Sequence, residues 1–79
     1  MNVPRWMLYG ANGYSGEMIA REAHRRGMKP VLAGRAAERV AALARELGCE
    51  HRAFALVDAV ATARALAGVA LVLNCAGPF

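Results

Sequence analysis

The sequence contains no long hydrophobic segment and no recognisable targeting signal. The longest apolar runs, such as Val69–Leu73, have only five residues. A membrane-spanning helix needs about 20. The N-terminal region carries neither a basic stretch followed by an apolar one nor a small-residue cleavage site. The sequence therefore predicts a cytoplasmic protein without a membrane segment.

Cysteine is scarce, and the two cysteines form no metal or disulfide pattern. Cys49 and Cys75 stand 26 positions apart and lack the Cys-x-x-Cys spacing that is typical of zinc sites. Since no secretory feature is found, we expect both to be free thiols. No histidine is placed in the sequence to activate Cys75, so a catalytic thiol is not favoured.

Aromatic residues and acidic residues are both few. Ten Lys and Arg against six Asp and Glu give a formal net charge of +4, which can indicate nucleic-acid binding. However, the pairs Glu17/Arg21 and Glu22/Arg26 have the i,i+4 spacing of a solvated helix surface. With five aromatic side chains and no basic stripe interleaved with them, we expect no nucleic-acid partner.

The length and composition indicate one small globular domain. The chain has 79 residues, of which 57% are hydrophobic and 20% charged, so it can build one core and lies far from the disordered class. No linker, repeat or low-complexity segment divides it. We therefore expect a single domain over residues 1–79.

Short apolar runs alternate with amphipathic segments along the whole chain. Strands are expected at residues 5–9, 30–34, 51–57 and 69–73, and helices at residues 15–26, 37–47 and 59–67. In the second helix Val40, Leu43, Ala44 and Leu47 recur at helical spacing. This alternation predicts an α/β protein with a parallel sheet covered on both faces and right-handed crossovers. The expected fold is the β-α-β-α-β-α-β half of a doubly wound, Rossmann-like sheet with strand order 3-2-1-4.

A glycine-rich stretch, GANGYSG, follows the first expected strand and begins the first helix. In this position Gly10 would make the sharp turn, Gly13 would let the backbone approach a pyrophosphate, and Gly16 would allow the helix to pack closely. The hydroxyl of Ser15 could add a hydrogen bond to phosphate. We interpret the stretch as a pyrophosphate-binding loop, with an ordinary turn as the alternative.

The loop departs from two familiar phosphate-binding motifs. Its spacing is G-x-x-G-x-x-G, whereas the commonest dinucleotide fingerprint is G-x-G-x-x-G. A Walker A motif is excluded because Gly16 is followed by Glu17 and not by lysine. The support for phosphate binding therefore comes from the position of the loop between a strand and a helix.

The end of the second expected strand bears on the choice of dinucleotide. Sites that prefer NAD carry Asp or Glu there, which accepts a hydrogen bond from the ribose 2′-hydroxyl, whereas a 2′-phosphate needs a cation. This sequence has Gly34 and Arg35, with no acidic residue before Glu38. NADP is therefore favoured over NAD, with Arg39 as a second candidate cation. The alternative is that Arg35 is merely solvated.

Weaker candidates follow the third and fourth strands. Asp58 could bind the adenine amino group, although its position also suits a helix N-cap. The residues after the fourth strand would lie where the cofactor ribose passes at the carboxyl edge of the sheet. These residues are Cys75, Ala76 and Gly77.

With these motifs, the chain resembles the N-terminal cofactor domain of the saccharopine dehydrogenase-like oxidoreductases, which include the trans-acting enoyl reductases. GANGYSG is similar to the family's G-A-T-G-Y-T-G loop, PVLAGR to its second strand and arginine, and LVLNCAGPF to its fourth strand and turn. Asn12 and Ser15 take the places of threonines. The resemblance implies an NADP(H) site with the turn after the fourth strand beside the cofactor. The expected cofactor-binding loop and strand-exit residues are Gly10, Asn12, Gly13, Tyr14, Ser15, Gly16 and Arg35.

No reaction centre is recognised in the sequence. The Tyr-x-x-x-Lys pair of short-chain reductases is missing, because Tyr9 and Tyr14 are followed four residues later by Gly13 and Met18. We therefore expect a fragment of a longer NADP-dependent oxidoreductase that carries no catalytic residue of its own. A non-catalytic nucleotide-binding or sensing module acting through a partner is the alternative, and a remnant that binds nothing is a third.

The fourth expected strand is apolar throughout. Without a fifth strand beside it, such an edge exposes unpaired backbone groups and apolar side chains. The sequence therefore predicts self-association through this edge.

Overall fold

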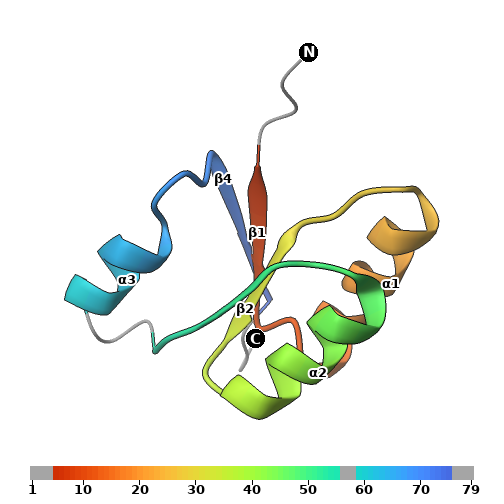
Figure 1. Cartoon of the computed structure of the whole chain (residues 1–79), viewed down its shortest axis with the longest axis horizontal. Helices are drawn as coiled ribbons and strands as arrows, with labels where there is room; N and C mark the ends of the chain where they lie inside the picture. Colours follow the sequence, from red (N-terminus) through yellow and green to blue (C-terminus); the bar gives the residue numbers. More distant parts are fainter. Residues whose placement is uncertain (1–4, 56–58, 76–79) are drawn as a thin grey trace.

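Strands and helices alternate along the chain, as Figure 1 shows. The structure is a computed structural model, and it describes residues 5–55 and 59–75. The elements within these ranges are β1 (Trp6–Tyr9), α1 (Tyr14–Arg25), β2 (Val31–Gly34), α2 (Ala37–Leu47), β3 (His51–Ala53), α3 (Ala59–Ala65) and β4 (Leu71–Asn74).

The described strands form one parallel sheet in the order β3-β2-β1-β4. Met7 on the central β1 pairs with Val31 of β2 on one side and with Val72 of β4 on the other. Helices α1 and α2 lie on one face of the sheet and α3 on the other (Figure 1). The predicted α/β, Rossmann-like fold and its strand order 3-2-1-4 are therefore confirmed.

Two apolar clusters hold these layers together, one on each face of the sheet. Because successive side chains of a strand point to opposite faces, Leu8 and Leu32 pack against α1 and α2, whereas Met7 and Val31 face α3. Covered from both sides, all four side chains are buried. This burial explains why the first two strands are continuously apolar in sequence.

Helix α2 has the predicted bounds and the predicted buried stripe. Val40, Leu43, Ala44 and Leu47 are all buried in the cluster below it. Burial of such a stripe is the main source of stability for a helix of this length. Helix α1 begins and ends one residue earlier than predicted, and its buried residues include Ala20 and Ala23.

Strand β3 is shorter than the sequence predicts. The amide of Phe54 donates a hydrogen bond to the carbonyl oxygen of Gly34, 3.0 Å away, at the point where β2 ends. Beyond this bond β2 offers no further partner, so the ladder stops although the sequence stays apolar. The predicted remainder of this strand falls partly outside the described residues, since residues 56–58 are not among them.

Strand β4 lies at the edge of the sheet, and the expectation that helices cover both faces is wrong for it. Leu71, Val72 and Leu73 are all exposed. The strand also begins two residues later than predicted, because its ladder starts where Leu71 meets Trp6, the first residue of β1. The sheet therefore has a buried centre and one apolar, open edge.

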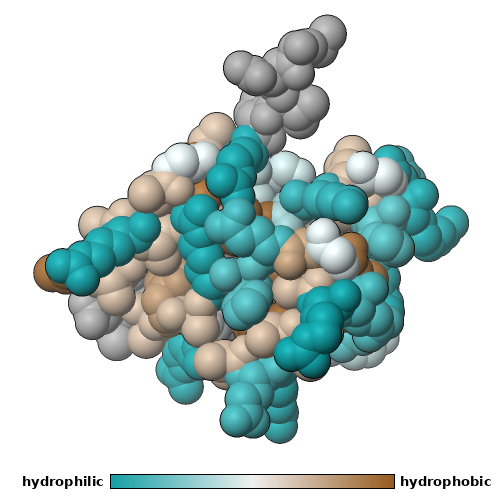
Figure 2. All heavy atoms as spheres, viewed as in Figure 1, coloured by the Kyte–Doolittle hydropathy of each residue, from teal (hydrophilic) through white to brown (hydrophobic). Residues whose placement is uncertain are grey.

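The surface differs between the two faces of the sheet. Figure 2 shows hydrophilic side chains gathered over α1 and α2, whereas the surface over α3 is largely apolar. In the part of the chain that the structure describes, no helix combines the length and the apolar character needed to cross a membrane.

Candidate cofactor site

The glycine loop connects β1 to α1 at the carboxyl edge of the sheet. Gly10 adopts a left-handed conformation with φ of 83°, which glycine tolerates without strain. The amides of Gly10 and Ala11 both donate to the carbonyl oxygen of Ala33 on β2, at 2.8 and 3.1 Å. The amide of Gly13 in turn donates to the carbonyl oxygen of Gly10, 3.0 Å away. The loop is thus fixed to β2 as well as to β1.

Helix α1 packs so closely against this loop that only glycine fits at position 16. A Cβ added at Gly16 would lie 2.0 Å from the carbonyl oxygen of Gly10 and 2.9 Å from Cα of Ala11. A Cβ at Gly13 would lie 3.3 Å from the same oxygen, a tight but less severe contact. The predicted role of Gly16 in close helix packing therefore agrees with the geometry.

The N-terminus of α1 presents free backbone donors. The N-cap residue Gly13 offers no side-chain hydrogen bond, and the first helical bond runs from the Glu17 amide to the Gly13 carbonyl, 2.8 Å away. Among the described residues, the amides of Tyr14, Ser15 and Gly16 have no acceptor. Together with the positive end of the helix dipole, such amides attract an anion.

An acidic side chain in the first turn of α1 forms an ion pair. Glu17 forms an ion pair with Arg21, whose Nε lies 2.9 Å from its carboxylate oxygen. The same guanidinium reaches across to α2 and contacts both carboxylate oxygens of Glu46, at 2.6 and 3.3 Å. These hydrogen bonds lower the pKa of Glu46 and raise the pKa of Arg21. Glu17 therefore has a cationic partner, Arg21, which it shares with Glu46.

Two cations near the loop have no ion-pair partner among the described residues. Arg35 follows the last residue of β2, and Arg39 lies in the first turn of α2, both with exposed side chains. Five other arginines pair with glutamates, namely Arg5, Arg21, Arg25, Arg26 and Arg52. The remaining cations lie before β2 or toward the C-terminal ends of helices, namely Lys29, Arg45 and Arg64. The unpaired charge at this edge of the sheet thus comes from Arg35 and Arg39.

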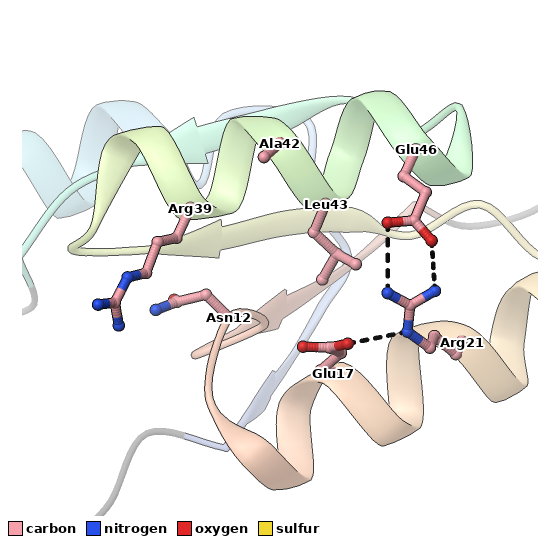
Figure 3. Close-up of a pocket in the computed structure, with 7 residues that line it drawn as sticks. All are labelled: Asn12, Glu17, Arg21, Arg39, Ala42, Leu43 and Glu46. Atoms are coloured by element: carbon pink, nitrogen blue, oxygen red, sulfur yellow. Dashed lines mark hydrogen bonds and ion pairs between the residues drawn. The ribbon is translucent and has the colours of Figure 1, made fainter.

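A hollow of about 280 Å³ lies between α1 and α2 beside the loop. Figure 3 shows that Asn12 and Arg39 stand at one end of it and that Arg21, bridging Glu17 and Glu46, closes the other. Leu43 and Ala42 complete its lining from α2. One end of the hollow therefore holds free donors, and the other holds one arginine shared by two carboxylates.

The sequence-predicted site residues converge in part. The glycine loop and Arg35 follow the ends of neighbouring strands, so they share the carboxyl edge of the sheet. Half-buried Cys75 follows β4 and donates its amide to the carbonyl oxygen of Tyr9, 2.8 Å away, which places it beside the loop. The predicted candidates Asp58, Ala76 and Gly77 lie outside the described residues.

Two contacts were not predicted from the sequence, one at this edge and one between the helices. Asn12 lies over Gly34, and Arg21 connects the two helices through Glu46. Both contacts join residues more than 20 positions apart, so no local pattern reveals them. Cys49 and Cys75 are free thiols, and no group of three metal-ligating side chains is found in the described ranges.

No protein-family model and no curated protein matches the sequence. Solved structures do. A nucleoside-diphosphate-sugar epimerase from Pseudomonas aeruginosa has a TM-score of 0.76 and 29% identity over 92% of this chain and 24% of its own. A 3-hydroxyacyl-CoA dehydrogenase type-2 from Mycobacterium avium has a TM-score of 0.78 and 27% identity over 96% of this chain and 33% of its own. The chain thus spans a third or less of these proteins, and its Rossmann-like fold is similar to a part of each.

Proposed function

We propose that this chain is the NADP(H)-binding domain of an oxidoreductase of the saccharopine dehydrogenase-like type. The observation that carries the proposal is the contact of Gly16 with the carbonyl of Gly10, which only glycine allows. This contact brings the free amides of the first turn of α1 to the carboxyl edge of the sheet. The structural similarity to a dehydrogenase and to an epimerase supports the coarser part of the proposal, a nucleotide-binding domain of Rossmann type.

The pyrophosphate is assigned to the N-terminus of α1. The amides of Tyr14, Ser15 and Gly16 donate to its oxygens, and the hydroxyl of Ser15 adds a further donor. Gly13 keeps the backbone free of a side chain where the phosphates approach. Because Glu17 is paired with Arg21, its carboxylate repels the pyrophosphate less than a free carboxylate would.

The 2′-phosphate is assigned to the unpaired cations at the end of β2. Arg35 offers a planar guanidinium that can donate two hydrogen bonds to one phosphate. Arg39, one turn further, adds a second positive charge. The nearest acidic residue in sequence is Glu38, which lies beyond the end of β2. No carboxylate in β2 can therefore accept a hydrogen bond from the ribose 2′-hydroxyl or repel a 2′-phosphate. NADP is accordingly preferred over NAD.

The residues after β3 and β4 complete the proposed site. Cys75, which follows β4, is assigned to the ribose beside the loop together with Ala76 and Gly77, and Asp58 is assigned to the adenine. When bound, the nicotinamide supplies hydride transfer. The chain's own residues bind and orient the cofactor, and the substrate and the reaction belong to a longer parent protein.

Calorimetric titration of the chain with NADPH and NADH tests the proposal. We expect NADPH to bind at least about tenfold more tightly, since charged hydrogen bonds to the 2′-phosphate contribute on the order of 1.5–3 kcal/mol. Binding of neither cofactor would contradict the proposed function. Equal affinities would contradict only the preference for NADP.

A further inference from the structure

We propose that Asn12 is a specificity-determining residue for the 2′-phosphate, acting together with the bare backbone of Gly34. The inference rests on the proposed function and assigns a role within that same site. The side chain of Asn12 fills the space in which residue 34 would carry a carboxylate, and its amide donates to the phosphate beside Arg39.

Gly34 ends β2 directly below the loop. A Cβ added there would lie 2.7 Å from Oδ1 of Asn12 and 3.0 Å from Cγ2 of Val40. Val40 is fully buried in the core and has little freedom to move. The Asn12 side chain therefore occupies the space into which any side chain at position 34 would project.

In dinucleotide sites, the residue at the end of the second strand influences whether NAD or NADP is preferred. An acidic residue at the end of the second strand accepts a hydrogen bond from the ribose 2′-hydroxyl of NAD, and the same carboxylate repels a 2′-phosphate. In this chain a side chain at position 34 would have to displace the Asn12 side chain and shift Cγ2 of Val40. The loop thus disfavours a carboxylate at position 34, and Arg35 supplies a positive charge beside it.

The side-chain nitrogen of Asn12 indicates that this residue also contributes directly to phosphate binding. Figure 3 shows its side-chain nitrogen turned toward the guanidinium of Arg39, at the same end of the hollow. Both groups are donors, so they cannot bond to each other. Arg39 has no ion-pair partner among the described residues. Two donors aimed at one space, with a net positive charge, suit an anion between them.

The discriminating variant is Asn12→Asp, which keeps the size of the side chain and replaces the donor amide by a carboxylate. We expect NADPH affinity to fall by at least about tenfold, the effect of losing one charged hydrogen bond and adding repulsion. NADH affinity should change less than about twofold, because NADH carries no phosphate on this ribose. Met28→Glu adds the same charge at an exposed position before β2 and serves as the control.

A second measurement needs no cofactor. Gly34→Asp alone should lower the thermal midpoint because its Cβ meets Asn12, whereas Asn12→Gly combined with Gly34→Asp should recover a large part of the loss. The double variant should also bind NADH more tightly than wild type. A Gly34→Asp variant as stable as wild type would overturn the steric part of the proposal.

The outcomes separate the two levels of inference. If the wild type binds neither NADPH nor NADH, the proposed function fails. Suppose instead that the wild type prefers NADPH. If Asn12→Asp then lowers the affinities for NADPH and NADH equally, or changes neither affinity, the role of Asn12 is overturned while the proposed function stands.

Discussion

The hydroxyl of Tyr9 on β1 donates a hydrogen bond to the carbonyl oxygen of Phe54, 2.8 Å away and 45 residues later in the sequence. Their rings also pack against each other, with centroids 5.0 Å apart and planes inclined by 51°. Both residues are buried on the face that α3 covers. The pair therefore connects the central strand with the segment that leaves β3, across the intervening β2.

Removing this hydroxyl should destabilise the fold measurably. Tyr9→Phe keeps the ring contact and deletes the donor, so we expect the free energy of unfolding in urea to fall by about 0.5–1.5 kcal/mol. Tyr14→Phe is the matched control, because the Tyr14 side chain is exposed and should tolerate the same change. A Tyr9→Phe variant as stable as wild type would show that the hydrogen bond contributes nothing net.

Position 16 should be more sensitive to substitution than position 13 of the same loop. Gly16→Ala places a methyl group 2.0 Å from a backbone oxygen that cannot rotate away, so we expect a loss of about 1–3 kcal/mol in unfolding free energy. Cofactor affinity should fall with it, because α1 must move away from the loop. Gly13→Ala, at 3.3 Å from the same oxygen, should cost less. The reverse order of the two variants in chemical denaturation would contradict the packing argument.

The charge of Arg35 should decide between the two dinucleotides. Arg35→Glu replaces a guanidinium that donates hydrogen bonds to the 2′-phosphate by a carboxylate that repels it. NADPH affinity should therefore fall by about 10–100-fold, while NADH affinity is kept or improved. Arg45→Glu makes the same change on the exposed surface of α2, nearer its C-terminal end, and controls for net charge. Calorimetry with both cofactors gives the ratio, and an unchanged ratio in Arg35→Glu would refute the assignment.

Stability should fall in acid through the ion pairs that connect the helices. The guanidinium of Arg21 lowers the pKa of Glu46 in the folded state, so the pair stabilises the fold above the unfolded pKa of 4.5. This contribution is lost as the pH falls through the folded pKa. Glu46→Gln should therefore give a flatter curve of unfolding free energy against pH. Glu38→Gln, which removes a carboxylate without an ion pair among the described residues, should leave the slope closer to wild type.

The open edge of the sheet should allow two copies to associate. Residues 71–73 of β4 are apolar and exposed, whereas β3 at the other edge carries the polar side chains of His51 and Arg52. Lysine on a strand edge opposes pairing, so Leu71→Lys should abolish concentration-dependent association in sedimentation velocity. Val60→Lys is the control, since Val60 on α3 is 63% exposed against 64% for Leu71. Sedimentation of the wild type as a monomer at all concentrations would contradict this expectation.

Elements with a clear apolar periodicity could be predicted from the sequence, because that periodicity reflects which side chains are buried. The stripe of α2 from Val40 to Leu47 identified its bounds, because a single buried face leaves a 3.6-residue period. The strand order 3-2-1-4 followed from assigning the alternating strands and helices to a doubly wound, Rossmann-like fold with right-handed crossovers. Local chemistry is sufficient for the helix, whereas the strand order depends on the fold type.

Strand ends and long-range contacts could not be predicted in this way. Apolar continuity after Ala53 indicates burial, but pairing ends there because β2 ends, and a partner's length is not encoded locally. The contact of Asn12 with Gly34 likewise depends on how α1, the loop and β2 meet in three dimensions. Asn12 was placed in the site as a loop residue, and its specific role depends on that contact.

The carbonyl oxygen of Ala33 accepts the amides of both Gly10 and Ala11. The glycine loop and the end of β2, which precedes Arg35 by one residue, are therefore joined through one atom. A rigid connection of this kind means that the parts assigned to the pyrophosphate and the 2′-phosphate are held in register before any ligand arrives. Binding then loses little conformational entropy in the loop, so affinity reflects the contacts themselves.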